Sequence, residues 1–138
     1  MVLKTHQFKR VLIVDDDAAS LFLARLTLED MQVAREVVSL QSAGEALHLL
    51  RSNCMNEQAS GQECPDLILL DINMPIMDGF DFLECLSALG QQSLINRVVV
   101  ALSSSNSPKD RQRMLGYGVL HFIVKPLTEE KILELWAT

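Results

Sequence analysis

Short apolar runs alternate along this chain with longer segments in which apolar residues recur at helical spacing. The apolar runs have the length of β-strands and lie at residues 11–14, 35–40, 67–70, 97–102 and 121–124. The run LILL at 67–70 is unbroken, which is typical of a strand buried on both faces of a parallel sheet. The run at 35–40 contains Arg35, Glu36 and Ser39, so we expect that strand nearer to an edge of the sheet.

The segments between these runs predict helices. They lie at 18 to about 31, 42–50, about 79–89, from about 108, and 128 to about 137. Each start has a signal: Asp17 or its neighbour can cap the first helix, Ser42 precedes Glu45 by three residues, and Pro108 suits a first helical turn. Thr128 precedes two glutamates. Strand and helix alternate five times, which predicts an α/β fold with a parallel sheet, right-handed crossovers and helices on both faces.

A polar segment at about 52–65 is longer than most connections in a compact domain. We interpret it as a surface excursion with room for an extra helical turn. Two of the three cysteines, Cys54 and Cys64, flank this segment and could pair, but an odd number at unpatterned spacing favours reduced thiols in the cytosol. His6, His48 and His121 lack the spacing of a zinc site, so we assign them no chemistry.

Composition narrows the function classes. A chain of 138 residues suits one domain, which we place at 1–138 with a core at about 10–136. The net charge of −6 disfavours binding to nucleic acid. No apolar run approaches the roughly 20 residues of a membrane span, and the first residues are polar and basic. We therefore expect a cytoplasmic protein without membrane or nucleic-acid partners.

Polar residues capable of chemistry follow four of the predicted strands. They are Asp15 and Asp16 after the first, Asp71 after the third, Ser103 and Ser104 after the fourth, and Lys125 after the fifth. In a parallel sheet these strand ends share one edge, where ligands bind. Crowded carboxylates repel one another, and a hard cation such as Mg²⁺ relieves that repulsion. A carboxylate, a metal ion, a hydroxyl and an ammonium group are suited to phosphoryl transfer.

These motifs resemble the receiver domain of two-component response regulators, over about Arg10 to Trp136. VLIVDDD is similar to that family's acidic strand end, LILLDINMPIMDG to its phosphoacceptor strand and loop, and IVKP to its lysine–proline motif. The stretches SSSNSPKD and PLTEEKILEL are similar to stand-alone receivers, so we expect no output domain. The resemblance implies a flavodoxin-like, three-layer α/β/α fold whose five strands lie in the order 2-1-3-4-5.

The resemblance also implies a role for individual residues. Asp71 would accept the phosphoryl group, and Mg²⁺ would be held by Asp15, Asp16, Asp71 and the backbone carbonyl of Asn73. Ser103 and Phe122 would be the switch residues, and Lys125 would contact the phosphate. Asn73, Ser104 and Ser105 are candidates for tuning the phosphate lifetime. The Lys125–Pro126 bond is often cis in such proteins.

The function expected from this resemblance is signalling rather than enzymatic turnover. A histidine kinase or a histidine phosphotransfer protein would phosphorylate Asp71, and the face formed by the helix after 108, strand 121–124 and the last helix would change. That face would bind a partner, take part in a relay, or join a weak homodimer, with Met114, Tyr117 and Leu127 as candidate contacts. The alternatives are a degenerate receiver that only binds proteins, and an aspartyl-phosphate phosphatase, which Asn73 disfavours because such enzymes usually have a second carboxylate there.

Overall fold

The computed structural model describes residues 8–55 and 63–137, so His6 and the middle of the polar segment at 52–65 lie outside the described residues. Its elements in chain order are β1 (Phe8–Val14), α1 (Ala18–Met31), β2 (Ala34–Leu40), α2 (Ala43–Leu50), the π-helical turn η1 (Arg51–Met55), β3 (Leu67–Asp71), α3 (Gly79–Ala88), α4 (Gln92–Val98), β4 (Val99–Ser103), α5 (Pro108–Gly116), β5 (His121–Val124) and α6 (Glu129–Ala137). Among them, no helix is long and apolar enough to cross a membrane.

The five strands form one parallel sheet in the order β2-β1-β3-β4-β5, which confirms the predicted topology. Its register pairs Val11 with Leu67, Ile68 with Val99, and Val100 with His121. All residues of β3 are buried, as the unbroken apolar run predicted. Because β2 lies at an edge, its polar residues Arg35 and Glu36 remain exposed.

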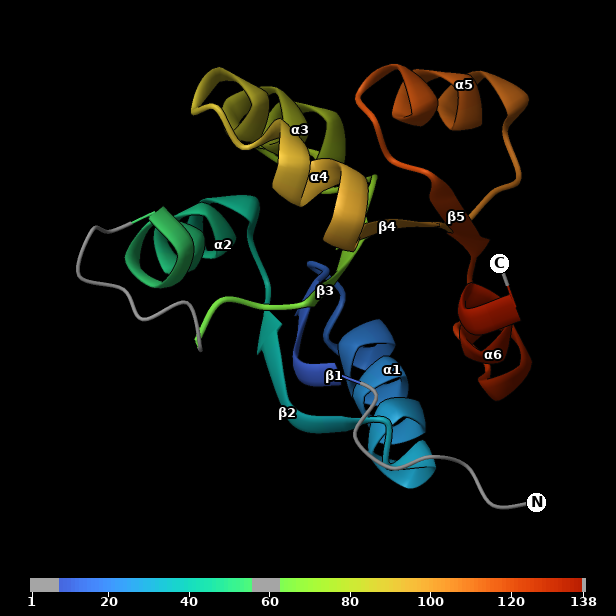
Figure 1. The fold of residues 1–138 in the computed structure, drawn as a ribbon. Helices are drawn as coiled ribbons and strands as arrows, with labels where there is room; N and C mark the ends of the chain where they lie inside the picture. The colour runs from blue at the N-terminus through green and yellow to red at the C-terminus, as the bar shows by residue number, and fades with distance from the viewer. Residues whose placement is uncertain (1–7, 56–62, 138) are drawn as a thin grey trace.

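Helices cover both faces of the sheet, with α1 and α6 on one side and α2, α3, α4 and α5 on the other (Figure 1). Alternate residues of β3 enter two separate cores: Ile68 and Leu70 pack beneath the larger group of helices, and Leu67 and Leu69 beneath α1 and α6. The arrangement is the expected three-layer α/β/α fold.

Side-chain caps mark the helix starts that the sequence predicted. Asp17 accepts a hydrogen bond from the Ala19 N–H, and Ser42 accepts one from the Glu45 N–H. Ser107 caps α5, with Pro108 in its first turn. Such caps satisfy backbone donors that have no partner within the helix.

Helix α4 was not predicted, because the sequence reading assigned residues 97 and 98 to a strand. In the structure Leu94, Ile95 and Val98 point into the core at helical spacing, and β4 begins only at Val99. The N-cap residue Gln91 makes no side-chain cap hydrogen bond, so no start signal marked this helix. The helix predicted from about 108 is therefore α5, and the last helix is α6.

The cysteine expectation was wrong for two of the three thiols. Cys54 and Cys64 form a disulfide, with a Cα–Cα distance of 4.9 Å, whereas Cys85 is free. The turn η1 continues α2 and brings its end close to the start of β3, where the Asn53 side chain donates to the Glu63 carbonyl (3.3 Å). The helical turn expected in the polar segment is thus present, and it is what places the two sulfur atoms together.

Candidate functional site

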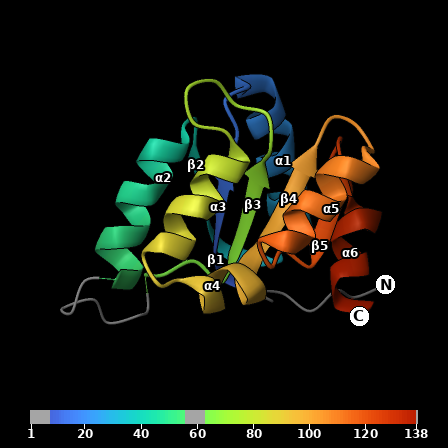
Figure 2. The ribbon, with the colours of Figure 1, turned by 90° about the horizontal axis from the view of Figure 1, so that it is seen from above.

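The carboxyl ends of the strands lie together at one edge of the domain (Figure 2). This edge receives Asp15 directly after β1, Asp71 as the last residue of β3, Ser103 as the last residue of β4, and Lys125 directly after β5. The four residues come from segments far apart in the sequence, and parallel pairing of the strands brings them to the same end of the sheet.

Three carboxylates gather at this edge. Asp15, Asp16 and Asp71 each offer one oxygen, and these oxygens lie within 4.8 Å of one another. Asp15 and Asp71 are buried, at 1% and 4% exposure, while Asp16 is exposed. Two buried carboxylates beside an exposed one form a hard oxygen donor set that is open to water, and such a set suits Mg²⁺, which keeps several of its water ligands.

Lys125 supplies the positive charge closest to the acids. Its Nζ donates a hydrogen bond to Asp15 Oδ2 at 2.6 Å and lies 3.5 Å from Asp71 Oδ1. Burial alone would lower the pKa of Lys125, but its hydrogen bond to Asp15 and the charge of Asp71 outweigh that effect and raise it. Lys125 therefore remains an ammonium group that offsets part of the negative charge.

The surroundings of Asp71 change the pKa of its carboxyl group. Burial and, after it, the charge of Asp15 raise the pKa of Asp71 to about 6, against the opposing effects of Lys125 and of the Asn73 N–H. That N–H donates to Asp71 Oδ1 at 3.4 Å. Without a metal ion the site thus disfavours the ionised form of Asp71, and a bound cation would favour it.

Gly79 lets the loop after β3 fold back onto Asp71. Its N–H donates to the Ile72 carbonyl at 2.9 Å. A Cβ at this position would lie 2.9 Å from the Asp71 carbonyl oxygen and 2.9 Å from the Ile72 Cα. The sequence placed Gly79 only at the expected start of a helix, because nothing local in the sequence reveals this close approach.

Ser103 is fully buried, and its hydroxyl is used within its own loop. Its Oγ donates to the Ser105 carbonyl at 2.8 Å and accepts from the Ser105 N–H at 3.1 Å. Ser104 and Ser105 are exposed beside it. The Lys125 N–H donates to the Ser103 carbonyl at 2.7 Å, and the Lys125–Pro126 peptide is cis.

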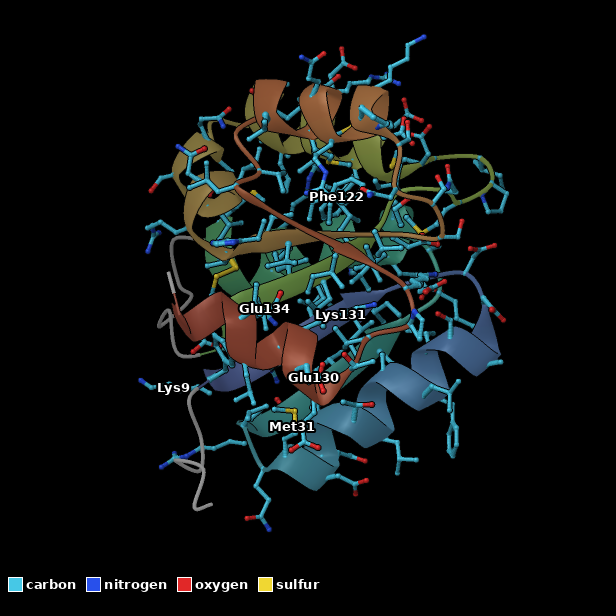
Figure 3. All side chains as sticks on the ribbon, turned by 90° about the vertical axis from the view of Figure 1, so that its right-hand side faces the viewer. Lys9, Met31, Phe122, Glu130, Lys131 and Glu134 are labelled. Carbon is cyan, nitrogen blue, oxygen red and sulfur yellow. A yellow bond between two sulfur atoms is a disulfide. The ribbon has the colours of Figure 1, made fainter. Side chains whose placement is uncertain are left out.

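Phe122 is half-buried on the side of β5 that faces α5 (Figure 3). Two of the three residues expected to offer apolar contacts on the neighbouring surface are instead part of the core: Met114 is 1% exposed and Leu127 is 9% exposed. Tyr117 is half-buried and lies 6.3 Å from the Phe80 ring, measured between centroids. Met114 and Leu127 therefore pack within the core and do not form an outward apolar surface.

Comparison with known proteins agrees with the site. The profile of the response regulator receiver domain matches residues 11–137. The two-component response regulator ARR10 of Arabidopsis thaliana is 32% identical over 127 residues, which is 92% of this chain and 20% of that protein. The curated relatives ARR10, ARR12 and ORR1 are all longer, and the chain spans 19% to 53% of their lengths.

Solved structures share the fold. A two-component response regulator from Cytophaga hutchinsonii superposes with a TM-score of 0.81 at 26% identity, covering 94% of this chain and 95% of that one. The receiver domain of the histidine kinase CKI1 from Arabidopsis thaliana, solved with Mg²⁺ and BeF₃⁻, superposes with a TM-score of 0.78 at 26% identity, covering 94% and 91%. The chain therefore belongs to the family of response regulator receiver domains.

Proposed function

We propose that Asp71 accepts a phosphoryl group from the phosphohistidine of a histidine kinase or of a phosphotransfer protein. The observation that carries this proposal is the cluster of three carboxylates within 4.8 Å, with the Lys125 ammonium 3.5 Å from Asp71. A cluster that serves only to bind proteins would have no need of two buried acids, since buried charge is costly.

In the proposed reaction an Asp71 oxygen attacks phosphorus while the bond between phosphorus and the histidine nitrogen breaks, leaving an acyl phosphate and a free imidazole. Asp15, Asp16, Asp71 and the Asn73 carbonyl would hold Mg²⁺, which when bound offsets charge on the transferring oxygens. Lys125 is close enough to Asp71 to contact one of those oxygens by a small rotation.

The switch would begin at Ser103. To donate to a phosphoryl oxygen on Asp71, its hydroxyl must give up the hydrogen bond to the Ser105 carbonyl. The loop would then move toward Asp71, and Phe122 would turn into the space left behind it. This is a local charge change that biases an element with two conformations.

The face formed by α5, β5 and α6 would transmit this change to a partner protein, or to a second copy in a weak homodimer. Helix α5 carries three basic residues and one acidic residue, whereas α6 carries three acidic residues and one basic residue. Glu130, Lys131 and Glu134 lie on α6, on the other side of β5 from α5 (Figure 3). Leu115 and Leu120 are 54% and 64% exposed near it. One basic and one acidic helix on a single face would suit antiparallel pairing of two copies.

Labelling with a small phosphodonor tests the central proposal. The protein is incubated with acetyl phosphate and Mg²⁺, and the adduct is tested for stability in acid and lability in base. We expect wild type to label, Asp71→Asn not to label, and EDTA to prevent labelling. Labelling that survives Asp71→Asn would contradict the assignment, and no labelling of wild type would favour a binding module that is independent of phosphorylation.

Asn73, Ser104 and Ser105 are proposed to tune how long the phosphoryl group persists. Asn73 and Ser105 donate backbone N–H hydrogen bonds to Asp71 and Ser103, so both residues lie next to the groups that would hold the phosphoryl group. Substituting each residue and timing the loss of label tests this role. Half-lives equal to that of wild type would remove it.

We also propose that the protein works in the cytoplasm, where ATP-dependent phosphodonors are available. Disulfides are rare there, so the Cys54–Cys64 bond is unusual for that compartment. Cell fractionation followed by immunoblotting tests the location, and recovery of the protein outside the cytosolic fraction would contradict it.

A further inference from the structure

Helix α5 is attached to the domain by few buried groups. Of its nine residues, only Met114 is buried. Two arginines add contacts on either side of it: the Arg111 guanidinium carbon lies 4.5 Å from the centre of the Phe122 ring, and that of Arg113 lies 3.9 Å from the centre of the Phe80 ring. An element with so little buried surface moves at a low free-energy cost.

Arg111 also contacts the loop between β4 and α5. Its Nη2 donates a hydrogen bond to Asn106 Oδ1 at 2.8 Å, and Asn106 directly follows Ser105, the partner of the Ser103 hydroxyl. One guanidinium group therefore contacts both the loop that carries the switch hydroxyl and the aromatic ring on β5. Arg113 makes the same kind of ring contact with Phe80, which takes no part in the proposed switch.

We propose that Arg111 is a positioning residue that holds Phe122 against α5 and so stabilises the unphosphorylated state. The inference rests on the function proposed for Asp71, because it concerns the same switch. When Phe122 turns inward, its ring leaves the guanidinium group, and Arg111 is released from the aromatic ring just as the loop bearing Asn106 moves. Loss of this contact is thus part of the cost of switching.

The size of that cost follows from the exposure of Arg111. A guanidinium group over an aromatic ring is attracted by the ring's quadrupole, more weakly at an exposed site than at a dry one. Arg111 is exposed and regains water when the ring departs. Removing the contact should raise the proportion of the inward conformation about two- to five-fold, which corresponds to about 0.5–1 kcal/mol. A ligand that binds the inward conformation better should gain apparent affinity by the same factor.

Substitution by methionine tests the role of the charge, because Arg111→Met keeps an apolar stem and removes the guanidinium group. Arg113→Met is the matched control, since it removes the equivalent group from the other side of the same helix. Arg111→Lys retains a cation without a planar group. The probe is beryllofluoride with Mg²⁺, titrated against each variant, together with NMR spectra of ring-labelled phenylalanine in which Phe122→Leu identifies the Phe122 resonance.

We expect Arg111→Met to bind beryllofluoride about two- to five-fold more tightly than wild type, and Arg111→Lys to lie between them. In the unliganded protein the Phe122 resonance of Arg111→Met should be displaced toward its position in the loaded wild type. Arg113→Met should change neither the affinity nor that resonance.

Two results would overturn the proposal. One is an Arg111→Met variant with wild-type affinity and an unmoved Phe122 resonance; the other is an equal effect of both methionine variants, which would indicate general loosening of α5. Acetyl phosphate labelling distinguishes a failure of the function proposed for Asp71 from a failure of the role proposed for Arg111. If wild type labels at Asp71 and Arg111→Met behaves as wild type, only the role of Arg111 fails; if wild type neither labels nor binds beryllofluoride, the function and the role of Arg111 fail together.

Discussion

Substituting Asp71 should stabilise the metal-free protein at neutral pH. Burial and the neighbouring Asp15 raise the pKa of Asp71 from 3.8 to about 6. One pKa unit corresponds to about 1.4 kcal/mol, so this rise corresponds to about 3 kcal/mol. Asp71→Asn removes the charge and keeps an oxygen that can accept from the Asn73 N–H. The variant should therefore gain up to about 3 kcal/mol in its free energy of unfolding when no metal is bound.

The sign of the pH dependence follows from the direction of the pKa change. A carboxyl group whose pKa is higher in the folded state than in the unfolded state favours folding fully only below the unfolded value of 3.8. Its contribution is lost as the pH rises through about 6. The difference in unfolding free energy between Asp71→Asn and wild type should thus be small near pH 4 and reach its full value above pH 7.

Urea denaturation in EDTA over this pH range measures the difference directly. Asp16→Asn is the control, because it removes an exposed and hydrated carboxylate of the same cluster and should change the free energy of unfolding much less. Addition of Mg²⁺ should stabilise wild type more than Asp71→Asn and so reduce the gap. An Asp71→Asn variant that is no more stable than wild type at pH 7.5, or a gap that does not depend on pH, would refute the reasoning.

Two further substitutions probe the framework of the site, and chemical reduction probes the disulfide. Lys125→Met leaves the buried Asp15 without its cation and should cost about 3 kcal/mol in urea denaturation, with Mg²⁺ restoring much of the loss; equal losses with and without Mg²⁺ would contradict this. Gly79→Ala places a Cβ 2.9 Å from two backbone atoms and should cost about 2 kcal/mol and slow acetyl phosphate labelling, whereas unchanged stability would disprove the close approach. Dithiothreitol should lower the thermal midpoint of wild type, since the Cys54–Cys64 bond closes a loop of sequence separation 10 and contributes about 2.7 kcal/mol by chain entropy. A Cys54→Ser, Cys64→Ser double variant should not respond to the reductant.

The sequence determined the regular elements other than α4, and the chemistry of the strand ends. Strands buried on both faces were visible as unbroken apolar runs, and most helices had a capping residue at the predicted position. Asp71 at the end of a buried strand was informative because an unpaired buried charge is costly. Once a parallel sheet was inferred, the meeting of Asp15 with Lys125, 110 residues away, followed from topology.

Other features depended on distances that no local pattern contains. The helix α4 has no side-chain cap, so only its packing against the sheet distinguishes it from the start of β4. Cys54 and Cys64 can bond only because η1 brings them together. Position 79 needs glycine only because its loop folds back onto the end of β3. Hydrophobic periodicity and helix caps involve residues only a few positions apart. They therefore predict individual helices and strands, but not the contacts between them.

Contacts between elements arise only when the sheet and helices have packed. The guanidinium group of Arg111 contacts the Phe122 ring because of the distance and orientation at which α5 packs over β5. In the sequence, Arg111 is only one of three basic residues on a short helix. The Ser103 hydroxyl, which the sequence placed at the correct strand end, has Ser105 as its partner because the loop closes on itself there. The sequence thus decided which chemical groups reach the edge of the sheet, and tertiary packing decided which of them touch.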